Sequence, residues 1–107
     1  MLLRQQERPV AAGPAIYLAW MGEATRDRVF PIAHRLRRRG LALELEGEAR
    51  SLKSQMRRAD KLRAAAVLII GEDEIRRGAA VLRDMASKRQ SEIALDELET
   101  VLTRDVH

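Results

Sequence analysis

This chain of 107 residues contains no cysteine, only two histidines and few aromatic residues. Without cysteine there can be no disulfide framework, no thiolate metal cluster and no cysteine nucleophile, and the composition fits the reducing cytoplasm in which we expect the protein to reside. The histidines, His34 and His107, are too isolated for a metal site or a catalytic triad. We expect His34 to lie on a helix surface.

Long hydrophobic runs and glycine-rich phosphate-binding loops are also absent. No segment approaches the ~20 apolar residues that cross a bilayer. Residues 1–8 are too polar for a signal peptide, so we expect no membrane span and no membrane partner. The motifs GxGxxG and GxxxxGKS/T do not occur, which removes support for nucleotide binding through such loops. A phospho-acceptor receiver domain is disfavoured because the first expected strand, residues 15–21, does not end in an acidic cluster.

The length of 107 residues suffices for one folded domain, since domains span roughly 50 to 250 residues. Residues 1–14 end in a segment rich in proline and glycine and are interpreted as a tail or linker, which leaves 15–107 as the domain. The charge is uneven: residues 1–63 carry 14 Lys/Arg against 7 Asp/Glu, and residues 64–107 carry 6 against 9. A basic first part favours a polyanionic partner, although an ordinary solvated surface would have the same composition.

The apolar pattern predicts an α/β fold. Strands are expected at 15–21, 41–46, 65–70, 79–85 and 92–95, and helices at 25–39, after the turn at 47–50, and from 96 to 103. The continuously apolar third strand indicates a central position, whereas the second alternates apolar and acidic residues, as on an edge. The order β-α-β-α-β-β-β-α predicts a mixed sheet with helices against its faces.

Two local signals concern the helix ends. Pro31 lacks a backbone donor, so we expect the first helix to start late or to bend there. Asp96 is followed three residues later by Glu99, which predicts an N-terminal cap for the last helix.

Four cationic residues recur at helical spacing and are expected on one side of the second helix: Arg50, Lys53, Arg57 and Lys61. The opposite side is expected to pack through Leu52, Met56 and Ala59. Such a helix can present its cations to solvent or to a partner.

An acidic turn, Glu72–Glu74, follows the apolar third strand. Its carboxylates could bind a hard cation, or they could begin a helix, where acidic side chains favour the positive end of the dipole. Together with the basic helix, the turn favours RNA binding, because cations neutralise phosphates and a carboxylate accepts hydrogen bonds from base amino groups. Sequence-specific RNA recognition generally uses unpaired loop bases, such as those of an anticodon loop.

Seven segments occur in a shared order and spacing: Gly22–Ala24, Leu36–Gly40, Arg50–Met56, Ala59–Lys61, Leu68–Glu74, Gly78 and Val81–Met85. Over about residues 15–104 they resemble the anticodon-binding domain of histidyl-tRNA synthetases. The resemblance implies a three-layer α/β fold with a five-stranded mixed sheet flanked by three helices. It also implies that the partner is a tRNA anticodon loop, that of histidine tRNA, and that this domain has no catalytic residue, no metal and no cofactor of its own.

By the same resemblance, Glu74 and Arg83 contact anticodon bases, with the acidic turn beside Arg83, and the cations at 50, 53, 57 and 61 lie near the RNA. The parent would be a homodimeric, ATP-dependent histidine–tRNA ligase. Its catalytic domain, acting in cis or in trans, would use ATP and Mg²⁺. This chain is therefore not expected to aminoacylate alone.

Three residues depart from the family pattern: Trp20, Pro31 and Ala49. Ala49 could alter the loop before Arg50, and Trp20 either packs beside the sheet or is available for stacking. Two alternatives stay open from the sequence. One is a regulatory or assembly domain of the synthetase paralogue that activates ATP phosphoribosyltransferase in histidine biosynthesis, and the other is a stand-alone α/β interaction module.

Overall fold

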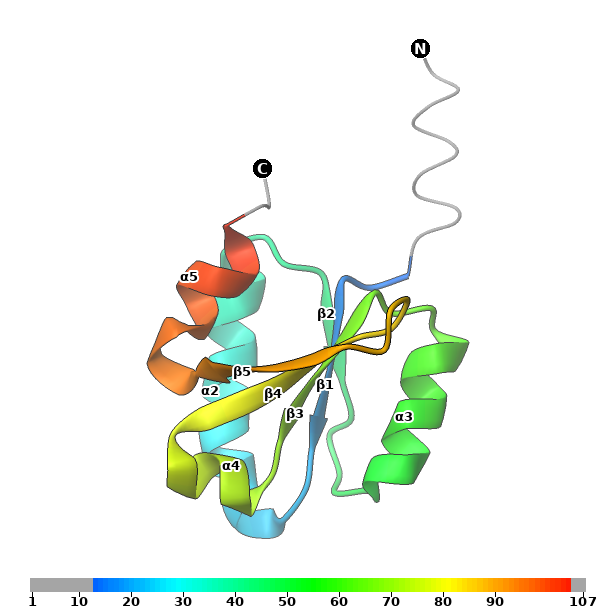
Figure 1. Ribbon diagram of the computed structural model, residues 1–107. Helices are drawn as coiled ribbons and strands as arrows, with labels where there is room; N and C mark the ends of the chain where they lie inside the picture. The colour runs from blue at the N-terminus through cyan, green and yellow to red at the C-terminus, as the bar shows by residue number, and fades with distance from the viewer. Residues whose placement is uncertain (1–12, 105–107) are drawn as a thin grey trace, which may run out of the picture.

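The structure, a computed structural model, describes residues 13–104 and is built around one sheet (Figure 1). The strands are β1 (Ile16–Trp20), β2 (Leu43–Leu45), β3 (Ala66–Ile70), β4 (Ala79–Asp84) and β5 (Gln90–Ala94), in the order β2-β1-β3-β4-β5. The pairs β1–β2 and β1–β3 are parallel, whereas β3–β4 and β4–β5 are antiparallel. The predicted five-stranded mixed sheet is confirmed.

Helices cover both faces of the sheet. They are α2 (Glu23–Arg38), α3 (Leu52–Lys61), α4 (Glu72–Arg77) and α5 (Leu98–Thr103), with a 3₁₀ turn, η1 (Leu95–Glu97), before α5. Figure 1 shows α3 on one face and α2 with α5 on the other, which confirms the three layers. The described residues hold four α-helices instead of the three expected, because the predicted acidic turn forms α4. None of these helices is long and apolar enough to cross a bilayer.

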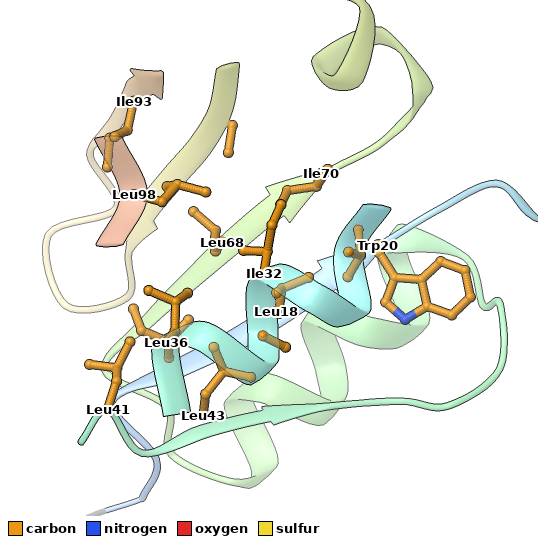
Figure 2. Close-up of a cluster of buried hydrophobic side chains, with 14 residues drawn as sticks. Leu18, Trp20, Ile32, Leu36, Leu41, Leu43, Leu68, Ile70, Ile93 and Leu98 are labelled. Carbon is orange, nitrogen blue, oxygen red and sulfur yellow. The ribbon is translucent and has the colours of Figure 1, made fainter. Parts of the chain in front are cut away.

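Side chains of the central strands alternate between two cores. All five residues of β1 are buried, with Leu18 and Trp20 facing α2 and Tyr17 and Ala19 facing α3. Figure 2 shows the larger cluster, in which β1 and β3 pack against Ile32 and other residues of α2. Burial on both faces explains why β1 and β3 are continuously apolar in sequence.

Helix α2 begins eight residues before Pro31 and continues past it, so of the two expected outcomes the late start is wrong, and the bend stays a prediction. Pro31 and Asp27, whose carbonyl loses its helical donor, are both on the exposed side of α2, where water can replace the missing bond. Val29 and Leu36 lie on the opposite, buried stripe. His34 is exposed, as predicted.

The predicted cap of the last helix is wrong. Asp96 lies inside η1, α5 begins at Leu98, and the residue at its N-cap, Glu97, makes no side-chain cap bond. Glu99 instead accepts a hydrogen bond from Arg39 at 3.1 Å and lies 3.7 Å from Arg35, which ties α5 to the end of α2.

The parallel strands define two ends of the sheet, which we call the carboxyl end, where β1, β2 and β3 finish, and the amino end, where they begin. Residues 1–12 of the expected tail and residues 105–107, including His107, lie outside the described residues. At the amino end the backbone of Pro14 accepts a hydrogen bond from Ala65 N at 3.1 Å.

Candidate nucleic-acid interface

The chain reverses direction across the sheet at β1. From β1 it crosses through α2 to β2 on one side, and from β2 it crosses through α3 to β3 on the other side. At such a switch point the loops after adjacent strands separate and leave a crevice at the carboxyl end. A crevice of about 350 Å³ lies there, between Met21–Gly22 and Gly71–Glu74.

Glu74 caps the helix that follows β3. Its Oε1 accepts a hydrogen bond from Gly71 N at 2.7 Å, which is the reciprocal half of a capping box, and its Oε2 lies 3.6 Å from Arg77. The side chain is 17% exposed. Glu74 is therefore a fixed acceptor at the crevice, with lone pairs still open to a donor.

Glu72 and Asp73 occupy the first turn of α4, which confirms the helix-start interpretation for both. Both side chains are exposed, and Asp73 pairs with Arg76 one turn later. Across residues 13–104, no three Asp, Glu or His side chains are grouped so that they could hold a metal ion.

Gln55 is a site residue that the sequence analysis missed. It is fully buried, and its amide accepts from Trp20 N at 3.1 Å while donating to the carbonyls of Trp20 at 2.8 Å and Arg50 at 2.9 Å. Strand β2 ends opposite Leu18, so the outer backbone groups of Trp20 have no strand partner. The Gln55 amide replaces that partner and holds the Arg50 loop against the end of β1.

The predicted basic side of α3 is exposed, but its members differ in their pairing. Arg50 lies before the helix and pairs with Glu46 at 3.6 Å and Glu48 at 3.8 Å. Within residues 13–104, the other three cations make no ion pair with a carboxylate: Lys53, Arg57 and Lys61. These three have charges that are free for an external anion.

The expected apolar side of α3 is partly wrong. Ala59 is buried and Met56 half-buried, but Leu52 is 37% exposed, and the buried position one turn on is taken by Gln55. Leu52 instead lines a groove of about 560 Å³ between α3 and the β4–β5 hairpin, which we call the α3–β4 groove. Its lining is Leu52, Lys53, Met56, Arg57, Asp60, Arg83, Met85 and Lys88.

Arg83 reaches the α3–β4 groove from the sheet. Its Nη1 donates to Gln90 Oε1 at 3.0 Å, which fixes the guanidinium. Its Nε is buried and has no hydrogen-bond partner among the described residues. A buried donor without a partner is costly to the folded state.

The structure does not bring Glu74 and Arg83 together. Arg83 pairs in register with Val67, whereas Glu74 caps Gly71, four residues further along the chain. At about 3.3 Å per residue the two places are about 13 Å apart along the strand. The expected position of the acidic turn beside Arg83 is therefore wrong, and the two side chains lie at different places on the surface.

A second groove, of about 740 Å³, lies on the other side of α3, toward β2. Tyr17 forms part of its wall, together with Glu46, Arg50 and Arg58. Burial is the main cause that raises the Tyr17 pKa above its ordinary value, Glu46 adds to it, and Arg58 opposes it. The Tyr17 hydroxyl is buried without a partner among the described residues.

Trp20 is packed and is not available for stacking on a base. It is fully buried, and its Nε1 donates to Glu46 O at 2.8 Å. The Phe30 ring meets it edge-on at 5.9 Å, and the Arg26 guanidinium lies over both rings. This departure from the family pattern is structural.

These elements define an α/β domain with a cationic groove and a crevice at the carboxyl end. Its sequence matches the family described as "Anticodon binding domain" over residues 15–105, so the chain belongs to that family. The resemblance and the fold class inferred from the sequence are thereby confirmed.

Individual relatives point the same way. The histidine–tRNA ligase of Desulfatibacillum aliphaticivorans is 41% identical over 97 residues, covering 91% of this chain and 23% of that protein. The histidyl-tRNA synthetase of Nostoc sp. PCC 7120 has a TM-score of 0.76 at 26% identity, covering 99% of this chain and 27% of the other. The apo enzyme of S. aureus has a TM-score of 0.79 at 23% identity, covering 94% and 31%, and supports the fold alone. The chain thus spans about a quarter of the relative's length.

Proposed function

We propose that this domain binds the anticodon loop of a transfer RNA, with histidine tRNA as its cognate, and that the parent protein is a histidine–tRNA ligase. The family and the names of the relatives support the assignment. We further propose that the parent is a homodimer whose catalytic domain, in cis or in trans, uses the ATP and Mg²⁺. The residues described above would supply recognition and no chemistry.

The α3–β4 groove is the observation that carries this proposal. Its floor presents the apolar surface of Leu52, Met56 and Met85, against which an unstacked base can lie. Lys53 and Arg57 stand at its rim, where they can neutralise the phosphates that join successive bases. An apolar floor bordered by free cations suits a single-stranded nucleic acid better than a neutral ligand.

The six predicted site residues receive different roles in this proposal. Lys53, Arg57 and Lys61 contact phosphates, and Arg50, already paired with acidic residues, contributes less. Arg83, whose side chain lines the groove, offers its guanidinium to an acceptor on a base edge. Glu74, held by Gly71 N, accepts a hydrogen bond from a base amino group of a second nucleotide at the crevice.

The test is a titration of the purified domain with histidine tRNA and with the same tRNA carrying a swapped anticodon, each at several salt concentrations. We expect tighter binding to the cognate anticodon at every salt concentration. Equal, weak and steeply salt-dependent binding to both would leave only phosphate attraction and would overturn anticodon reading. The full-length parent is the positive control, since the isolated domain lacks its other tRNA contacts.

Glu74→Gln tests the base-reading role without removing the cap, because a glutamine oxygen still accepts from Gly71 N. We expect the variant to lose about 1–3 kcal/mol of discrimination between the two anticodons. Its total binding free energy for the cognate tRNA should fall by less than its discrimination does. Arg28→Gln, an exposed change on α2, is the matched control. A uniform loss of affinity for both tRNAs would contradict the assigned role.

A further inference from the structure

At the amino end of the sheet, on the side covered by α3, exposed cations gather from segments far apart in the sequence. Lys61 and Arg63 follow from the end of α3, and Lys88 and Arg89 come from the β4–β5 turn. The two segments are neighbours, because Met85 N donates to Ala65 O at 3.0 Å, and Figure 1 shows them on the same side of the sheet.

This group is not balanced by ion pairs. Within residues 13–104 none of the four cations lies within ion-pair distance of a carboxylate. Two acidic residues are nearby in the chain, Asp60 and Asp84. The Asp84 carboxylate is occupied, since it accepts from Ser87 N at 2.8 Å, and that bond is the main cause that lowers its pKa.

Two of these cations have an unusual backbone. Arg63 has φ 62° and Lys88 has φ 66°, and they are the only non-glycine residues with positive φ among those described. The left-handed conformation costs an L-residue about 1–2 kcal/mol, and glycine or asparagine is the usual occupant. Stability alone therefore favours glycine at both positions, and the presence of two exposed, unpaired cations there points to a role in binding.

The two residues extend a line of positive charge from the α3–β4 groove. Lys53 and Lys61 are separated by about 12 Å along α3, at 1.5 Å per residue, and Arg63 lies two residues beyond Lys61. Lys88 itself lines the groove, opposite α3. A polyanion that enters the groove at Lys53 can therefore continue past Arg57 and Lys88 toward the amino end, with Asp60 as the acidic side chain in the groove lining.

We propose that Arg63 and Lys88 form a second RNA contact, to the phosphates of the base-paired stem adjoining the loop. This inference rests on the proposed function. A paired strand presents a regular row of phosphates, and exposed cations that follow one another along α3 and the β4–β5 turn can neutralise several of them. Contacts of this kind carry no sequence information, but they fix how the loop is presented to the groove.

The test compares the wild-type domain with the double variant Arg63→Gly, Lys88→Gly. Glycine suits both backbone conformations, so the variant removes the charges while preserving the fold. The probes are a hairpin RNA containing the histidine anticodon loop on its stem, and the loop sequence alone as a single strand. Arg28→Gln with Arg38→Gln removes the same charge from exposed positions of α2, on the opposite face of the sheet, and is the control.

Two lost phosphate contacts should reduce the slope of log K against log salt for the hairpin by about 1.4–1.8, whereas the slope for the single-stranded loop, which can meet only Lys88 in the groove, should fall by at most about 0.7. The control should leave the hairpin slope unchanged. An unchanged slope in the glycine variant would overturn the stem contact and would leave this surface to a protein partner. An equal reduction of the slope in the control would show that the effect comes from net charge alone and would overturn the contact.

A failure of anticodon reading would be seen in a different measurement, because the wild-type domain would then bind the cognate and the swapped anticodon equally well. In that case a reduced slope in the glycine variant would still support a phosphate contact. If the wild-type domain bound neither probe at low salt, both proposals would fail.

Discussion

The two ends of the sheet differ in how their loops are held and in what their charges do. At the carboxyl end, side chains bind backbone groups: Gln55 binds Trp20 and Arg50, and Glu74 binds Gly71. Most charges there are paired, as in Arg50 with Glu46. At the α3 side of the amino end, backbone hydrogen bonds join the loops and the cations are unpaired. The carboxyl end depends on particular side chains for its shape, whereas the amino end, where Asp84 accepts a hydrogen bond from Ser87 N, leaves its cations free.

Gln55→Ala should have the largest effect, because it removes the bridge that shapes the carboxyl end. Buried groups of Trp20 would lose their partners, and we expect the free energy of unfolding to fall by about 2–4 kcal/mol. Gln55→Glu should not rescue it near neutral pH, since a carboxylate cannot donate to the two carbonyls. Urea denaturation measures both, with the exposed Arg57→Ala as control. A loss below about 1 kcal/mol would show that water replaces the amide.

Gly22→Ala should disturb the same end through the backbone. Gly22 has φ 93°, and a methyl group there would lie 2.6 Å from Glu72 Oε2, so we expect a loss of about 1–3 kcal/mol. Gly47→Ala is the matched control, because its methyl group would meet nothing within 4 Å and its φ is not in the left-handed range. That change should be neutral or stabilising by up to about 1 kcal/mol. Similar thermal shifts for both variants would contradict this difference.

The ionisation of Tyr17 measures how strongly burial and the neighbouring charges of Glu46 and Arg58 act on a buried hydroxyl. Its pKa is raised in the folded protein, mainly by burial and further by Glu46, so the unfolded chain releases the phenolic proton first. The protonated Tyr17 hydroxyl therefore makes its full contribution to stability below about pH 10, and this contribution is lost as the pH rises through the pKa of the folded state. Tyr17 is the only tyrosine, so tyrosinate absorbance reports it directly.

We expect Tyr17→Phe to lessen the alkaline loss of stability and to cost nothing at neutral pH, because it removes a buried hydroxyl that has no partner among the described residues. A destabilisation above about 1 kcal/mol at neutral pH would mean that an ordered water satisfies this hydroxyl.

The smallest effect is expected at the amino end. Arg63→Gly or Lys88→Gly relieves a left-handed backbone but makes the unfolded chain more flexible, so the net gain should be a few tenths to about 1 kcal/mol. Calorimetric melting temperatures of the two single variants measure it. A clear destabilisation by either change would show that these side chains hold the turns, which would remove the contrast with the carboxyl end.

Much of the fold could be predicted from periodicity. The five strands and the face on which α2 packs follow from apolar spacing, because strands buried on both faces and a helix with one buried stripe leave strong patterns. The errors were local. Asp96 and Glu99 match a capping box, yet Glu99 pairs with Arg39, and α4 was taken for a turn because six residues are too few for a helical pattern.

The candidate site was less predictable, since it depends on contacts across the sheet. Gln55 carries no sequence signal as a polar residue in a charged helix, and only the early end of β2 makes its amide necessary. Leu52 matched the apolar stripe of α3 but lines an open groove. Both outcomes follow from which strand lies opposite each turn of α3, and helical spacing does not contain that information.

The sequence alone determined the family, the strand order along the chain and the cationic character of α3, because these follow from local residue patterns. Tertiary structure decided where the charges act. It placed Glu74 and Arg83 apart and made Glu74 the N-terminal cap of α4. It also brought the segment of Arg63 beside the β4–β5 turn, which carries Lys88. The physical reason is that strand register and helix crossover set distances between residues far apart in the chain, and a binding surface is made of those distances.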